Sequence, residues 1–195
     1  MRAFTTPSDE DLLRGMRDGD EQAFVVLYRR RQGEIYRYTL HMSGSTALAE
    51  EVTQEVFMAL IRDPQQFDPA RGLLLAYLYG VARHQVLRRI ERDRTYVPLE
   101  TEDLDRILPA KGSVAEDLLR REAVETVRRA VLSLPANYRE VVVLCDLQEM
   151  TYEQAAGLLE CAVGTVRSRL HRGRALLAAK LRPRLQAAAA VRCLA

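Results

Sequence analysis

The chain has 195 residues, and its 29 basic and 27 acidic side chains leave a formal net charge of +2. A content of 48% hydrophobic and 29% charged residues is typical of a globular protein, and it excludes fibrous and disordered chains. The longest uncharged apolar run, residues 73–82, is too short for a transmembrane helix, and three cysteines without a CxxC spacing exclude a disulfide framework and a zinc ribbon.

Apolar residues recur at helical spacing through the first half of the chain. Ser8, with an acidic residue three positions later, predicts a capped first helix, and a longer helix opens at Asp20. A third helix covers the apolar positions of residues 48–60. Two prolines and a glycine then predict a loop over residues 63–72. The last helix of this half, residues 73–94, begins apolar and ends basic.

Residues 95–113 interrupt the helical pattern. They contain two prolines, a glycine and four acidic residues, which is typical of an extended linker. Helical spacing returns near Val114, and although residues 141–144 have strand propensity when taken alone, their flanks favour a helix. The sequence therefore predicts an all-α fold class, with two helical domains at residues 8–94 and 114–186 joined by a flexible acidic linker.

A helix-turn-helix is predicted in the second domain. Thr151 with Gln154 three residues later forms a capping box, and a second helix begins after a short turn at residues 160–162. At about 100° per residue, one face of this second helix points inward, and it carries Val163, Val166, Leu170 and Gly173. The outer face and its flanks carry Thr165, Arg167, Ser168, Arg169, His171 and Arg172.

Basic residues concentrate in the same domain. Residues 123–195 carry 11 basic and 6 acidic side chains, and no acidic residue follows Glu160. Arginine bonds guanine edges in a fork, and Ser or Thr bonds bases or phosphate, so the second helix suits a DNA major groove. Arg174 and the basic residues after it would contact phosphate or nothing. The alternative is an ordinary helical hairpin with a solvated basic face, but the capping box, the tight turn and the absence of acids favour DNA binding.

This segment closely resembles region 4 of bacterial sigma factors, especially of their extracytoplasmic-function group. The resemblance lies in residues 151–156, which read T-Y-E-Q-A-A, and residues 163–174, which read V-G-T-V-R-S-R-L-H-R-G-R. In the first domain, residues 47–60 resemble region 2.2, and residues 67–83 resemble the stretch that spans regions 2.3 and 2.4. The two motif sets follow the family's order and cover nearly the whole chain, so the chain resembles the minimal two-domain type.

The resemblance implies a protein that binds core RNA polymerase and directs it to promoter DNA. Region 2.2 would dock on the polymerase through Glu50, Glu51, Gln54 and Glu55. The loop and the basic helix after it would hold the melted minus-ten strand through Phe67, Asp68, Arg71, Arg83, His84, Arg88 and Arg89. The minus-thirty-five element would be read by Thr165, Arg167, Ser168, Arg169, His171 and Arg172. An anti-sigma factor would hold the protein inactive.

No enzyme activity, cofactor, metal or small-molecule substrate is expected. The three histidines are scattered, and the sequence contains no glycine-rich phosphate loop or metal-ligand spacing. Cys145 and Cys161 are expected to be small buried apolar residues. Because no signal-peptide pattern opens the chain, we expect a cytoplasmic location, at the inner face of the membrane when an anti-sigma factor holds it there.

Other interpretations are open for the same residues. The chain could be a stand-alone helix-turn-helix regulator whose first domain senses a ligand or a partner, although such a protein needs neither region 2 motif. The acidic face of residues 50–55 could simply be solvated. Phe67 could fill its own loop instead of contacting a base, and Tyr77 and Tyr79 are expected in the core.

Overall fold

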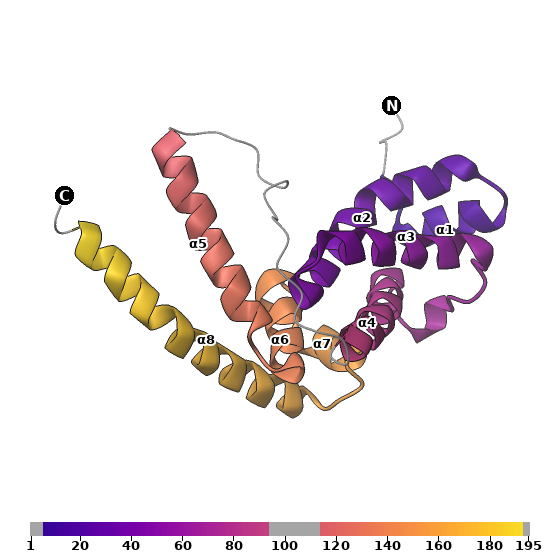
Figure 1. Cartoon of the computed structure of the whole chain (residues 1–195). Coiled ribbons are helices and arrows are strands. Elements are labelled where there is room, and N and C mark those ends of the chain that lie inside the picture. The colour runs from indigo at the N-terminus through magenta and orange to yellow at the C-terminus, as the bar shows by residue number, and fades with distance from the viewer. Residues whose placement is uncertain (1–5, 94–113, 193–195) are drawn as a thin grey trace. The chain divides into compact units, whose positions relative to one another are not determined.

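The computed structural model describes residues 6–93 and 114–192, whose helices are shown in Figure 1. No strand occurs among these residues, and the predicted all-α fold class is confirmed. The first half contains α1 (Asp9–Arg17), α2 (Glu21–Ser43), α3 (Thr46–Arg62), the short 3-10 helix η1 (Pro69–Arg71) and α4 (Leu74–Asp93). The second half contains α5 (Val114–Leu132), α6 (Ala136–Val142), the π-helical turn η2 (Val143–Leu147), α7 (Tyr152–Leu158) and α8 (Val163–Arg192).

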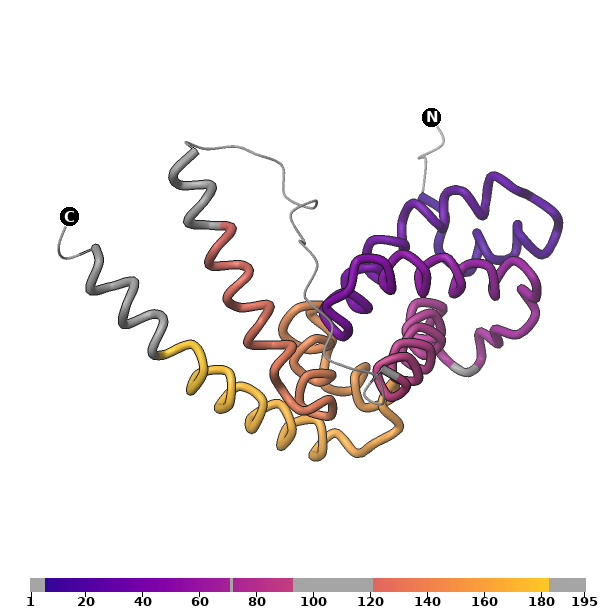
Figure 2. Tube along the Cα trace, in the orientation of Figure 1, coloured from indigo at the N-terminus to yellow at the C-terminus, as the bar shows by residue number. Residues whose placement is uncertain are grey.

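The helices gather into two compact units. One is built mainly from α1 to α4 and the other mainly from α5 to α8, and the tube in Figure 2 follows the backbone through each of them. The linker predicted at residues 95–113 lies outside the described residues. Its role as an extended, flexible linker and the predicted domain boundaries therefore stay predictions from the sequence.

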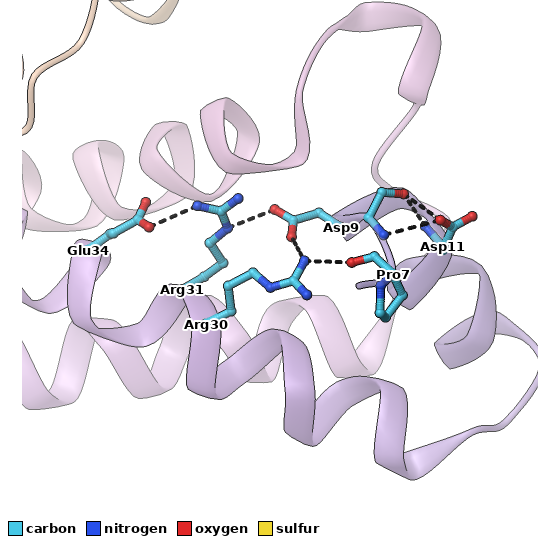
Figure 3. Close-up of polar contacts among 7 residues, drawn as sticks. Pro7, Asp9, Asp11, Arg30, Arg31 and Glu34 are labelled. Atoms are coloured by element: carbon cyan, nitrogen blue, oxygen red, sulfur yellow. Dashed lines mark hydrogen bonds and ion pairs between the residues drawn. The ribbon is translucent and has the colours of Figure 1, made fainter. Parts of the chain in front are cut away.

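The first helix, α1, is capped at its start and tied to α2. The Ser8 hydroxyl accepts a hydrogen bond from the Asp11 N–H, and the Asp11 carboxylate accepts one from the Ser8 N–H, both at 3.1 Å, so the predicted cap is confirmed and is a full capping box. Asp9 accepts hydrogen bonds from Arg30 and Arg31 of α2, each at 2.7 Å (Figure 3). Because the Asp9 side chain is only 14% exposed, these charge-assisted bonds hold the start of α1 on α2.

The core of the first unit is apolar and aromatic. The periodic apolar residues of α3 are buried as predicted: Val52, Val56 and Leu60. The Tyr28 ring of α2 meets the Phe57 ring of α3 edge-on, with 4.9 Å between the ring centroids. Tyr79 of α4 is 1% exposed, which confirms its expected place in the core. Since these faces of α3 and α4 are buried, their opposite faces meet solvent.

The ambiguous residues 141–144 are helical and buried. α6 begins directly after Pro135 and passes at Val143 into the wider turn η2, where the Gln148 N–H donates to the Val143 carbonyl at 2.9 Å. Three of the four residues are β-branched, which explains their strand propensity. Here they fill the core from a helix, so the helical interpretation is confirmed.

The predicted helix-turn-helix is formed by α7 and α8. The Thr151 hydroxyl accepts a hydrogen bond from the Gln154 N–H at 3.2 Å, and the Gln154 side chain accepts one from the Thr151 N–H at 2.9 Å. This second capping box is therefore confirmed. The turn passes through Glu160 in the left-handed conformation, with a φ of 50°, and the Cys161 N–H closes it on the Ala156 carbonyl at 3.0 Å.

The inward face of α8 packs as predicted. Val166 and Leu170 are buried, and α8 lies against both α6 and α7 (Figure 1). A Cβ atom at Gly173 would lie 2.8 Å from Cγ2 of Val142, which is closer than any side chain there could approach. α8 therefore crosses α6 at a glycine, and its opposite face is left to solvent.

Candidate nucleic-acid interface

The polar face of α3 lies opposite its buried face. Glu50, Glu51 and Gln54 are exposed, and Glu55 is half-buried. Their spacing of one, three and four residues places them along one side of the helix, as predicted for a docking face. The structure thus brings these four side chains together on one surface of the first unit.

Two large apolar side chains that were not among the predicted docking residues extend this face. Met58 is 40% exposed and Ile61 is 45% exposed. They follow Gln54 by four and seven residues, which is the spacing of one side of a helix. That spacing was the available signal, although apolar residues in an amphipathic helix are normally assigned to its core.

Arg89 of α4 joins the polymerase-docking residues to the predicted DNA-binding residues. Its guanidinium donates two hydrogen bonds to the Glu51 carboxylate, at 2.8 and 2.7 Å, and reaches Glu55 at 3.4 Å. The hydrogen bond from Arg89 lowers the pKa of Glu51 below its ordinary value. The family resemblance implies separate partners for Glu51 and Arg89, whereas the structure pairs the two side chains with each other.

The loop between α3 and α4 folds around Phe67. This side chain is 4% exposed, and the centroid of its ring lies 5.7 Å from that of Tyr77, which is itself half-buried. The Tyr77 hydroxyl donates to the side-chain oxygen of Gln66 at 3.0 Å. Phe67 therefore fills its own loop, which was the second of the two interpretations, and its ring offers no surface on which a base could stack.

Asp68 is exposed on this loop, as is Asp63 at the start of the loop. Its Oδ1 accepts a hydrogen bond from the Ala70 N–H at 3.0 Å and so caps η1. The side chain of Arg71, the third residue predicted here, lies outside the described part of the chain. Among the described loop residues that were predicted to meet the minus-ten strand, Asp68 is the one that reaches solvent.

The second half of α4 presents basic side chains in more than one direction. His84 and Arg88 are exposed and lie one helical turn apart. Arg83 is half-buried, and Arg89 faces α3 through its contacts with Glu51. The exposed pair of His84 and Arg88 is therefore the part of the predicted strand-binding set that is directed to solvent.

The outer side of α8 carries the residues predicted to read duplex DNA. Arg167, Ser168, His171 and Arg172 are exposed, whereas Thr165 and Arg169 are half-buried. The Arg167 guanidinium lies 5.8 Å from the centroid of the Tyr152 ring of α7, a cation–π contact that supports this arginine. The Ser168 hydroxyl donates to the Thr165 carbonyl at 3.0 Å.

One arginine beyond this surface is held by an acid. The Arg174 guanidinium donates two hydrogen bonds to the Asp146 carboxylate of η2, at 3.1 and 2.6 Å. Such a bidentate pair fixes both side chains, so Arg174 braces α8 on η2. The prediction from the sequence was that Arg174 contacts either phosphate or no partner.

The cysteines of the second unit are only partly covered. Cys145 and Cys161 are half-buried, so the expectation of buried cysteines is met in part, and burial raises the pKa of the Cys145 thiol.

Within residues 6–93 and 114–192, no group of three or more His, Cys, Asp and Glu side chains is placed to hold a metal ion. None of the helices that the structure describes combines the length and the apolarity of a membrane-spanning segment.

Comparison with known proteins finds a family match in each half of the chain. The family model of Sigma-70 region 2 matches residues 27–95, and that of Sigma-70 region 4 matches residues 125–177. The ECF RNA polymerase sigma factor SigE of Mycolicibacterium smegmatis is 34% identical to the chain over 179 residues, which cover 88% of this chain and 68% of SigE. The chain belongs to the ECF family of RNA polymerase sigma factors.

Further sigma factors are similar over most of their length. ECF RNA polymerase sigma factor SigW of Bacillus subtilis is 29% identical over 178 residues, covering 87% of this chain and 95% of SigW. The solved structure of CnrH with the cytosolic domain of CnrY shares 22% identity and a TM-score of 0.66, over 90% of this chain and 97% of CnrH. That of RpoE from Bartonella quintana with the anti-sigma factor NepR shares 21% identity and a TM-score of 0.65, over 85% and 98%. These two structures have the same fold.

As an ECF sigma factor, the protein binds core RNA polymerase and directs it to promoter DNA. The region 2 match decides between the two hypotheses of the sequence analysis, because a stand-alone helix-turn-helix regulator needs no region 2. The exposed residues of each helix are then the basis for inferring which surface contacts the polymerase and which contacts the promoter.

Proposed function

We propose that this ECF sigma factor engages the polymerase and the promoter through three separate surfaces. The exposed face of α3 docks on core polymerase. Asp68 and the exposed basic side chains of α4 hold the melted minus-ten strand. The outer side of α8 reads the minus-thirty-five element as duplex DNA.

One observation carries the docking proposal: Met58 and Ile61 are exposed in line with Glu50 and Gln54. Exposed large apolar side chains beside charged ones are typical of a surface that a protein partner covers. The alternative, an acidic face that is merely solvated, gives no reason for these two apolar side chains to face water. The polymerase surface opposite should therefore be basic with an apolar centre.

Glu51 and Glu55 have a different task in this proposal. Their ion pairs with Arg89 hold the basic half of α4 against α3, so they position the strand-binding helix. Glu50 and Gln54 are then the polar residues that meet the polymerase directly. This division refines the set predicted from the sequence, in which all four residues had the same role.

Capture of the minus-ten strand is assigned to exposed groups. A carboxylate such as Asp68 can accept hydrogen bonds from base N–H groups, which become accessible once the base leaves the stack. His84 and Arg88 follow the strand backbone, where positive charge contributes without reading sequence. Phe67 supports the loop from beneath.

Regulation and location belong to the same proposal. The anti-sigma factor NepR is bound to RpoE in one of the solved complexes, and this supports an anti-sigma partner for the present chain. The protein would then work in the cytoplasm, at the inner membrane face when its partner is anchored there. The chain itself binds and positions, and core polymerase performs the bond-forming chemistry.

The docking proposal is tested with a double variant, Glu50→Lys with Gln54→Lys. Reversing the charge on this face should weaken binding to core polymerase by about tenfold or more, because charges that meet across an interface become repulsive. Co-elution of the chain with purified core polymerase in gel filtration measures the effect. Glu10→Lys with Gln22→Lys, which makes the same charge change at exposed positions of α1 and α2, serves as the matched control and should co-elute normally. Unchanged co-elution of the double variant would contradict the proposal that this face of α3 docks on core polymerase.

A further inference from the structure

A side chain far from the minus-ten loop in sequence is bonded to that loop's backbone. Arg17, the last residue of α1, donates from Nε to the Pro64 carbonyl at 3.0 Å and from Nη2 to the Phe67 carbonyl at 2.6 Å. Both acceptors are neutral main-chain oxygens, so the contact fixes the path of the chain between residues 64 and 67. The side chain of Arg17 is half-buried, and it was not singled out by any sequence motif.

Both ends of this contact are themselves held. The start of α1 is fixed to α2 through Asp9, which binds Arg30 and Arg31 (Figure 3). On the loop side, the buried ring of Phe67 and the bond from Tyr77 to Gln66 fix neighbouring residues. The loop is thus anchored by its own buried aromatic ring and by hydrogen bonds from Arg17 of α1.

Asp68 directly follows the anchored carbonyl of Phe67. Its exposed carboxylate can meet a flipped base only if the preceding backbone has a defined direction, because misplacement by about 1 Å is enough to lose a specific contact. Two hydrogen bonds from one planar guanidinium define that direction. A lysine in place of Arg17 has a single charged nitrogen and cannot reproduce the pair of planar bonds.

We propose that Arg17 is a positioning residue for minus-ten recognition: it holds the loop of residues 63–72 so that Asp68 is presented to the flipped base. The inference rests on the proposed function, in which this loop reads the melted strand. It adds a residue of α1, outside both region 2 motifs found in the sequence, to the machinery of base selection.

The test uses holoenzyme reconstituted from core polymerase and the full chain. A pool of single-stranded oligonucleotides randomised over the minus-ten positions is bound, and the base preference at each position is counted by sequencing. Arg17→Gln should reduce the preference roughly tenfold at the positions that Asp68→Ala also affects, because a specific base contact contributes discrimination of that order. Arg17→Lys should give an intermediate loss, since it keeps the charge but has one donor nitrogen instead of two.

Arg14→Gln is the matched control. Arg14 lies on the same helix, its side chain is 70% exposed, and its ion pair is with Asp11 of α1. The same change of charge there should leave the base-preference profile unaltered. Co-elution with core polymerase, measured on the same samples, verifies that each variant is folded.

The outcomes separate the inference from the function on which it rests. A profile changed by Asp68→Ala but not by Arg17→Gln, even with a lower melting temperature for the latter, would overturn the positioning role and keep loop recognition. A profile changed by neither variant would overturn loop recognition and the inference together. Loss of preference at every position, and not only at those shared with Asp68→Ala, would also contradict the positioning role.

Discussion

Among the described residues, some arginine side chains are held by carboxylates, whereas others bind main-chain carbonyls or face solvent, and their positions in the sequence do not distinguish these cases. Arg89 and Arg174 are bound by carboxylates, at Glu51 and Asp146. Arg172 of α8 is exposed on the outer side of the helix. Binding to DNA depends on salt because basic side chains displace counterions from phosphate, and a guanidinium already paired with a carboxylate contributes less to this displacement.

This division gives a prediction for two neighbouring arginines of α8. Arg172→Ala should lower the slope of log affinity against log salt concentration by about 1, because one phosphate or base contact is lost. Arg174→Ala should leave the slope unchanged and cost less than about 1 kcal/mol of unfolding free energy, since its ion pair with Asp146 is solvent-exposed. Titration of holoenzyme onto a promoter duplex at several salt concentrations measures both slopes. Equal slopes for the two variants would show that Asp146 does not keep Arg174 from the DNA.

At the scale of elements, two adjacent residues of the loop between α3 and α4 have different roles, one in packing and one in the proposed binding of DNA. Phe67 is buried, whereas Asp68 is exposed and caps η1. Substitutions one residue apart should therefore fail in different ways. A defect at Phe67 reports on the loop's fold, and a defect at Asp68 reports on what the loop binds.

The two substitutions separate these tasks. Phe67→Ala should lower the free energy of unfolding by about 3–5 kcal/mol, because a buried aromatic ring is replaced by a cavity. Asp68→Ala should cost about 1 kcal/mol or less, the usual value of a helix cap, and should reduce opening of duplex promoters. Thermal unfolding measures the first effect, and permanganate reactivity of unpaired thymines measures the second.

A premelted template supplies the control for this prediction. If Asp68 stabilises only the melted strand, a promoter with a minus-ten bubble should partly rescue Asp68→Ala, because the energy of opening the duplex is then already supplied. An α8 variant such as Arg172→Ala should receive no comparable rescue. Equal defects of Asp68→Ala on duplex and bubble templates would remove the loop from the melting step.

The elements could be predicted because the signals that form them are local. Each capping box, at Ser8 and at Thr151, depends on residues three positions apart, and each helix repeats its apolar positions within a short window. The bonds that shape the site are different. Arg17 reaches carbonyls 47 and 50 residues away, and Arg89 reaches a carboxylate 38 residues away, so no short sequence pattern contains both partners.

At the scale of the whole molecule, the sequence predicted binding surfaces but not the burial or pairing of each side chain on them. The motifs placed polymerase and promoter contacts on α3, α4 and α8, where exposed residues do occur. Within these predicted sets, some side chains are buried or paired and others are exposed: Phe67 fills its loop, and Glu51 binds Arg89. Both depend on tertiary contacts, which hydrophobic periodicity and family resemblance leave undetermined.

In the proposed function, three surfaces of one chain contact core polymerase, the melted minus-ten strand and the minus-thirty-five duplex, one surface for each. Site-specific photocrosslinking in a single holoenzyme–promoter complex tests it most directly, with the photoreactive amino acid placed in turn at Glu50, Asp68 or His171, all of which are exposed. We predict crosslinks from position 50 to a polymerase subunit, from position 68 to the melted minus-ten strand, and from position 171 to the upstream duplex. Crosslinks from position 50 to DNA, or from position 171 to polymerase alone, would contradict the account.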